Sequence, residues 1–128
     1  MSVLSLTIMV LLSLVIGEVS PCNTYGKTDG CSIPGDLPFF YKGAFRSACN
    51  RHDVCYACGY GSGVSRSVCD RRFYNNLLSR CQRESFWMRG FCRKIAEIYY
   101  NAVKHNGDEY YDVPSLSWCG SSWVPGCM

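Results

Sequence analysis

The stretch "SACNRHDVCYACG", Ser47 to Gly59, decides the expected fold, because it sets three cysteines around one of only two histidines in the chain. Cys49, Asp53 and Tyr56 recur at spacings of four and three, which places them on one face of a helix. The glycine-rich "GYGSG" that follows should end that helix. We therefore predict a first helix over residues 43–57.

Two more helices are expected downstream. An apolar stripe with a spacing of four begins and ends in cysteine: Cys69, Phe73, Leu77 and Cys81. This stripe predicts a second helix over residues 65–82. A third is predicted over 88–104, with Gly107 as its stop. Its expected buried stripe is Phe91, Ile95, Ile98 and Ala102. Strand patterns are weak, so the fold class is mostly α.

The beginning of the chain resembles a targeting segment. Residues 3–16 are almost wholly apolar, which is typical of a secretory signal peptide, and we place its cleavage after Gly17. The run is short for a spanning helix, and a retained membrane anchor is the alternative. Cleavage would leave 128 − 17 = 111 residues, a single domain over residues 18–128.

All ten cysteines lie in that domain. An even count at this density, behind a signal peptide, indicates a disulfide framework and a secreted, extracellular protein. A short chain benefits from such cross-links because its core is limited. The formal net charge of +3 permits attraction to an anionic membrane surface. No motif supports nucleic-acid binding.

The chemistry available to the first helix comes from adjacent residues. His52 and Asp53 point about 100° apart on a helix, so they serve two functions rather than forming one pair. Histidine titrates near neutral pH and can act as a general base. A carboxylate is a hard oxygen ligand that suits Ca²⁺. A base beside a cation is what hydrolysis by an activated water requires.

A histidine base needs an acceptor for its far nitrogen, and Asp70 is the best candidate. If Cys55 and Cys69 are bridged, the two helices are held side by side and Asp70 is brought towards His52. The hydroxyl of Tyr56, one turn after the histidine, could then fix the same carboxylate. The rival carboxylates lack such a tether: Asp108, Glu109 and Asp112.

A calcium ion needs more oxygen ligands than Asp53 supplies, since Ca²⁺ takes roughly six to eight. The upstream loop "TYGKTDGCS" can turn backbone carbonyls inward, because glycines such as Gly30 allow unusual backbone angles. Asp29 could add a second carboxylate. Cys31, if joined to Cys49, would hold this loop against the first helix.

"CNRHDVCY" resembles the active-site helix of the secreted phospholipases A2, which carry C-x-x-H-D-x-C-Y. "CDRRFYNNLLSRC" resembles the second long helix of that superfamily. The resemblance implies that His52 is the base, Asp53 a calcium ligand and Asp70 the orienting carboxylate, bonded by Tyr56. It also implies two disulfides, Cys31–Cys49 and Cys55–Cys69. The other six cysteines allow fifteen pairings.

The loop "YGKTDGCSIPG" departs from the Y-G-C-x-C-G-x-G-G loop of the vertebrate and snake-venom enzymes. It is similar instead to the bacterial and fungal type and, most of all, to the conodipines of cone-snail venom. In the bacterial type an aspartate just before G-C-S is a calcium ligand, which maps onto Asp29. The resemblance covers roughly residues 22–82. Conodipines are two disulfide-linked chains cut from one precursor, and the Arg83–Gly90 stretch is the best place here for such a cut.

The resemblance thus implies a small disulfide-stapled domain with two antiparallel active-site helices, a third helix and an N-terminal calcium loop. It implies a secreted, calcium-dependent phospholipase A2 of venom that hydrolyses the sn-2 ester of glycerophospholipids at a membrane or micelle surface. One alternative is a phospholipase-like toxin that acts mainly by binding a receptor or membrane protein. Another is a calcium-binding structural protein on the same scaffold.

Overall fold

A computed structural model describes Cys22, Cys31 and residues 40–128. Within this part of the chain the fold is mostly helical and contains no strand. No helix among the described residues combines the length and the apolar character that crossing a bilayer requires. The predicted signal peptide, residues 1–17, and its cleavage point lie outside the described residues.

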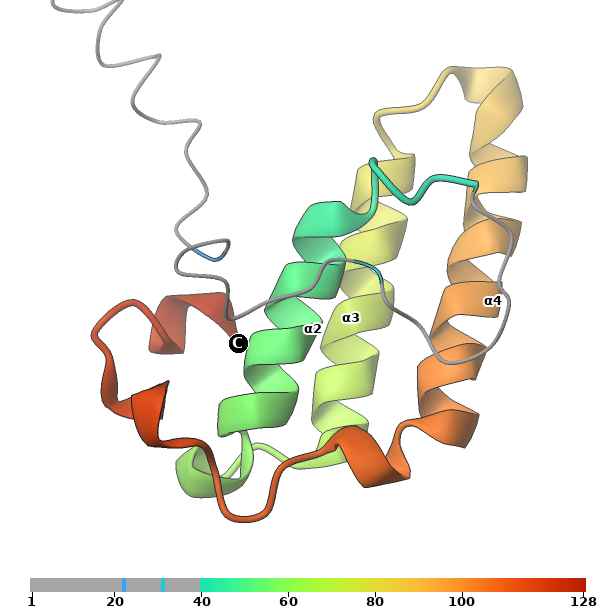
Figure 1. Ribbon diagram of the computed structural model, residues 1–128. Coiled ribbons are helices and arrows are strands. Elements are labelled where there is room, and N and C mark those ends of the chain that lie inside the picture. Colours follow the sequence, from blue (N-terminus) through green and yellow to red (C-terminus); the bar gives the residue numbers. More distant parts are fainter. Residues whose placement is uncertain (1–21, 23–30, 32–39) are drawn as a thin grey trace, which may run out of the picture.

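Three helices form the body of the molecule (Figure 1): α2 over Arg46–Cys58, α3 over Arg66–Cys81 and α4 over Arg89–Asn106. Their bounds differ from the predicted ones by three residues at most. At the start of α3, the side chain of Ser65 accepts a hydrogen bond from the backbone N–H of Val68, so the helix begins with a side-chain cap. Short 3₁₀ turns connect the helices and make up much of the tail.

Helix α3 lies between the other two and packs against both. The four residues of its predicted stripe are all buried, which confirms that part of the pattern: Cys69, Phe73, Leu77 and Cys81. Phe73 and Leu77 join the main core cluster, together with Phe45 from just before α2. The core between the helices therefore rests on the α3 stripe.

The predicted stripe of α4 is wrong in part. Phe91 and Ile98 are about two-fifths exposed, whereas Ile95 is buried as expected. The buried face of this helix is Cys92, Ile95, Ala96, Tyr99 and Val103. A disulfide between Cys92 and Cys81 turns this face towards α3. Because a cysteine pairing cannot be read from sequence, hydrophobic spacing alone chose a stripe one position away.

Five disulfides hold these elements together: Cys22–Cys127, Cys31–Cys49, Cys55–Cys69, Cys58–Cys119 and Cys81–Cys92. The two pairs implied by the resemblance are both among them.

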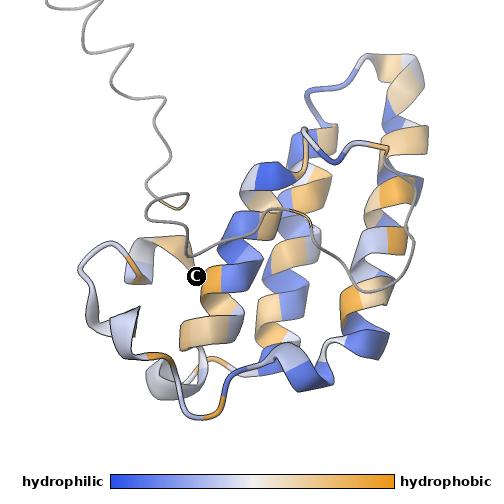
Figure 2. Ribbon diagram, in the orientation of Figure 1, coloured by the Kyte–Doolittle hydropathy of each residue, from blue (hydrophilic) through white to orange (hydrophobic). Residues whose placement is uncertain are grey.

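Figure 2 shows that α2 is hydrophilic over its first turns and hydrophobic over its last. Those last turns pack with the tail, where Trp118 and Trp123 stack at 5.6 Å between ring centroids beside Val124. The two tryptophans therefore help to pack the tail onto α2.

Candidate active site

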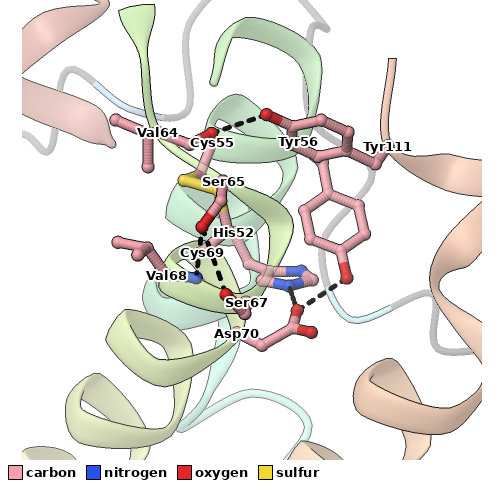
Figure 3. The surroundings of a disulfide bond; sticks show 10 residues. All are labelled: His52, Cys55, Tyr56, Val64, Ser65, Ser67, Val68, Cys69, Asp70 and Tyr111. Atoms are coloured by element: carbon pink, nitrogen blue, oxygen red, sulfur yellow. Dashed lines mark hydrogen bonds and ion pairs between the residues drawn. A yellow bond between two sulfur atoms is a disulfide. The ribbon is translucent and has the colours of Figure 1, made fainter. Parts of the chain in front are cut away.

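The centre of the site is a contact between α2 and α3. The Nε2 atom of His52 lies 2.8 Å from Oδ1 of Asp70 (Figure 3), and the two residues are only 7% and 3% exposed. A disulfide between Cys55 and Cys69 joins the same two helices next to this pair. An ionised carboxylate only accepts hydrogen bonds, so Nε2 carries the proton. The other ring nitrogen, Nδ1, then carries a lone pair and is the atom that can act as a base.

Tyr56 supports the same carboxylate from α2. Its hydroxyl donates a 2.6 Å hydrogen bond to the oxygen of Asp70 that faces His52 (Figure 3). Burial raises the pKa of Tyr56 well above its usual value, and the hydrogen bond to Asp70 raises it further. Tyr56 is therefore a neutral donor throughout the pH range in which a histidine base works.

Two aromatic rings hold the imidazole of His52 in place. The ring centroid of Tyr56 lies 4.1 Å from that of His52, and the centroid of Phe73 lies 4.6 Å away. The contact with Tyr56 comes from α2 itself and the contact with Phe73 from α3. These two contacts leave the imidazole little freedom to rotate away from Asp70. Phe73 was predicted as a core residue, and it also belongs to the site.

Two residues behind Tyr56 were not expected in the site. A Cβ atom on Gly107 would lie 2.5 Å from the Tyr56 hydroxyl and 3.2 Å from Nη1 of Arg66. Arg66 donates a 3.4 Å hydrogen bond to the carbonyl of Val103, near the end of α4. The sequence indicated Gly107 only as a helix stop, which it is, and carried no pattern for Arg66.

The three carboxylates that the sequence offered as alternatives to Asp70 lie outside the His52–Asp70 contact. Asp108 is exposed and pairs with Arg66 at 3.4 Å. Glu109 is exposed, and the backbone N–H of Asp112 bonds the carbonyl of Tyr56. Of the predicted groups, the structure therefore brings together His52, Asp70 and Tyr56. These three residues form the hydrogen-bonded unit that the sequence predicts for a base and its support.

The predicted calcium ligands are only partly described. Asp53 is half-buried on α2, beside His52, while Asp29 and Gly30 lie outside the described residues. In the part that the structure does describe, no group of three or more His, Cys, Asp or Glu residues is arranged to hold a metal ion. The Cys31–Cys49 disulfide attaches the end of the upstream loop to α2, one turn before Asp53. A carboxylate there has the hard-oxygen chemistry that fits Ca²⁺.

Curated relatives match parts of the chain. Conodipine-P3 of Conus purpurascens is 41% identical over 56 residues, which are 44% of this chain and 30% of that protein. The Conodipine-M alpha chain of Conus magus is 34% identical over 55 residues, 43% of this chain and 70% of that one. A secretory phospholipase A2 of Arthroderma benhamiae is 32% identical over 96 residues, 69% of this chain and 62% of that protein.

The chain thus spans less than a third of the length of the first of these relatives. No solved structure matches it. A family model described as prokaryotic phospholipase A2 matches residues 18–107, which include all three helices and the whole His52–Asp70 site. The chain therefore belongs to the prokaryotic phospholipase A2 family.

Proposed function

We propose that this protein is a secreted, calcium-dependent phospholipase A2 that hydrolyses the sn-2 ester of glycerophospholipids. The observation that carries the proposal is the buried contact between His52 and Asp70. With Nε2 donating to Asp70, Nδ1 is the ring nitrogen that can act as the base. Membership of the family gives the reaction type. The relatives named conodipine support a role in venom, and the relative named secretory phospholipase A2 supports a role in lipid degradation.

The reaction needs a water molecule made nucleophilic next to an ester carbonyl. In the proposed mechanism, Nδ1 of His52 takes a proton as the water oxygen bonds to the carbonyl carbon. Asp70 accepts from Nε2 and stabilises the positive charge that the ring then carries. When the ester bond breaks, Nδ1 returns the proton to the leaving glycerol oxygen. The products are a free fatty acid and a lysophospholipid.

The proposed cation site uses oxygen atoms from two segments. Asp53 would bind the ion from α2, and Asp29 with the carbonyl of Gly30 would bind it from the loop before Cys31. The disulfide from Cys31 to α2 supports this assignment, because Asp29 is only two residues from the bridged cysteine. A Ca²⁺ ion held there would supply positive charge next to the ester carbonyl and its developing oxyanion. In this scheme α2 and α3 are the two antiparallel active-site helices.

The five disulfides favour an oxidising, extracellular location. Processing into two chains would also be compatible with them. If the precursor is cut between Arg83 and Gly90, the Cys81–Cys92 disulfide spans the cut and keeps the two pieces joined. The mass of the natural protein before and after reduction would show whether such a cut occurs.

The test of the proposed function is fatty-acid release from phospholipid vesicles, with Ca²⁺ and with a chelator. We expect release that requires calcium and that falls by at least about a thousandfold in His52→Gln, which keeps a similar volume but removes the base. Circular dichroism should show that the variant is folded. Activity that survives both the chelator and the substitution would contradict the mechanism. A folded wild type that releases nothing would favour the toxin that acts by binding.

A further inference from the structure

The turn between α3 and α4 exposes two large aromatic side chains. Phe86 is 85% exposed and Trp87 is 78% exposed, the highest values among the large hydrophobic side chains of the described chain. Both lie in the short 3₁₀ turn Phe86–Met88. Nearby, Phe40 and Phe91 form a further exposed pair, with ring centroids 5.6 Å apart. Adjacent exposed aromatics of this size mark a surface that contacts something other than water.

The turn is built to keep those rings outside. The Cys81–Cys92 disulfide ties the end of α3 to the first turn of α4 and closes the base of the turn. Arg89 donates a 3.2 Å side-chain hydrogen bond to the carbonyl of Glu84. A 2.8 Å backbone bond from Met88 to Ser85 closes the 3₁₀ turn. In the uncut chain the aromatic pair is therefore presented on a braced support, and binding would require little further ordering of the backbone.

The net charge around the turn is positive. Residues 79–94 contain five basic side chains and one acidic one, so their formal charge is 5 − 1 = +4. The whole chain carries only +3, which leaves 3 − 4 = −1 for everything else. The one acid, Glu84, already pairs with Arg80 at 3.1 Å. The face that presents the aromatics is thus complementary to an anionic surface.

A hollow beside the turn is lined by further cationic and polar side chains. It has a volume of about 200 Å³ and lies between α2 and α3. Three of its lining residues are arginines, namely Arg51, Arg80 and Arg83, and none is acidic. Serine and asparagine side chains line the rest of its polar wall. Guanidinium, hydroxyl and amide groups can all donate to phosphate oxygens, so the hollow suits the headgroup of a phospholipid.

We propose that the α3–α4 turn is the membrane anchor of this protein: Phe86 and Trp87 enter the interface of an anionic phospholipid bilayer, and the arginines around them bind its phosphates. Tryptophan and phenylalanine favour that depth of a membrane, and a cationic rim adds to their affinity. The choice of a phospholipid bilayer as the partner rests on the proposed function. The anchor lies at the end of the bundle where α2 begins (Figure 1), and Ala48, which lines the hollow, is one turn before His52. An anchored molecule would therefore hold α2 at the lipid surface.

The test measures binding without hydrolysis, so every variant carries His52→Gln. Vesicles of phosphatidylcholine with an equal amount of phosphatidylglycerol are compared with vesicles of phosphatidylcholine alone. We expect Phe86→Ala with Trp87→Ala to lower the partition coefficient on the anionic vesicles at least about tenfold. Tyr60→Ala, which removes an exposed aromatic between α2 and α3, is the matched control and should bind normally.

The charges are tested in the same way. Arg83→Gln should weaken binding to the anionic vesicles about fivefold. Arg71→Gln removes the same charge from an exposed position near the start of α3 and should change nothing. Tryptophan emission should shift to the blue on anionic vesicles, and the double aromatic variant should lose most of that shift. Equal binding by the aromatic variant and Tyr60→Ala would overturn the proposal.

Absence of vesicle binding by the His52→Gln chain without further substitutions would also overturn it and would indicate a protein partner for the aromatic pair. A separate measurement tests the proposed function. The chain with His52 intact is assayed for hydrolysis of a short-chain phosphatidylcholine below its micelle concentration. The aromatic variant should hydrolyse this dissolved substrate at the normal rate and lose rate only on vesicles. No hydrolysis of it by the wild type would reject the enzyme and leave the binding results to decide the anchor.

Discussion

A Cβ atom on Gly107 would lie 2.5 Å from the hydroxyl oxygen of Tyr56, a separation that real Cβ atoms do not show. Gly107 caps α4, and Tyr56 lies on α2, so the end of one helix closes the site formed by the other two. The glycine is required here for space, because its φ of −84° is open to other residues. A side chain at Gly107 would therefore press on the backbone carbonyl of Val103 and on the Tyr56 hydroxyl together.

We expect Gly107→Ala to displace the Tyr56 hydroxyl and, through Asp70, to loosen the hold on His52. The clash should cost about 1–3 kcal/mol of unfolding free energy. Fatty-acid release should fall about tenfold in kcat with little change in KM, because substrate binding is not touched. Gly120→Ala is the control, since a Cβ atom there meets nothing within 4 Å. Normal kcat in Gly107→Ala would mean that Tyr56 does not position the site.

Tyr56→Phe should distinguish the contribution of the Tyr56 hydroxyl from that of its ring. The ring still packs against His52, while Asp70 loses one of its two donors. A hydrogen bond to a charged group contributes about 1.5–3 kcal/mol, so urea unfolding should show a loss of that size. Activity should fall clearly, but by less than in His52→Gln.

Tyr99→Phe is the matched control for that loss. It removes another buried hydroxyl, which donates to the carbonyl of Phe40 at 3.0 Å and does not touch His52. We expect this variant to lose stability and to keep its kcat. If both variants lose activity in proportion to stability, the Tyr56 hydroxyl supports folding alone.

The stability of the protein should decrease at alkaline pH, and Tyr56 should account for part of that decrease. Burial raises its pKa above the ordinary value of 10.0. In that case the unfolded chain loses the proton first, so the stabilisation is complete below about pH 10 and disappears as the pH rises through the folded pKa. One such group gives a slope of about −1.4 kcal/mol per pH unit in the free energy of unfolding.

Urea unfolding at a series of pH values checks this expectation. Tyr56→Phe should show a shallower decline above about pH 10 than the wild type. It should keep some decline, because burial also raises the pKa of Tyr99 and Tyr111. Identical slopes for the two proteins would contradict the assignment of Tyr56 as a buried neutral donor.

Removal of Cys58–Cys119 should cost more stability than removal of Cys55–Cys69, whereas removal of Cys55–Cys69 should cost more activity. Cys58–Cys119 closes a loop of 61 residues and Cys55–Cys69 a loop of 14. Chain entropy predicts losses of about 4 and about 3 kcal/mol when each pair is changed to alanine. Activity should fall more without Cys55–Cys69, because that bond joins the helices of His52 and Asp70. Comparison of melting temperature and fatty-acid release tests both rankings. Equal activity in the two variants would mean that the Cys55–Cys69 disulfide does not hold the site together.

The sequence predicts the parts of this site that depend on spacing along one helix. The α3 stripe follows a regular period of four, so Leu77 could be assigned to the core without a structure. Asp70 could be assigned because it follows a cysteine that the family pairs with α2. The face of α4 could not, since Cys92 fixes it through a pairing that spacing does not reveal. Gly107 belongs to the site through a contact between distant segments, and a single sequence carries no record of such a contact.

Three of the five disulfides end on α2, at Cys49, Cys55 and Cys58. They attach that helix to the upstream loop, to α3 and to the tail. In a reducing compartment all three attachments are absent at once, and the base, its aspartate and the loop are no longer held together. Under the proposed function, catalysis would then begin only after export to an oxidising compartment. The cell that synthesises the chain would be protected from it until the cysteines have been oxidised.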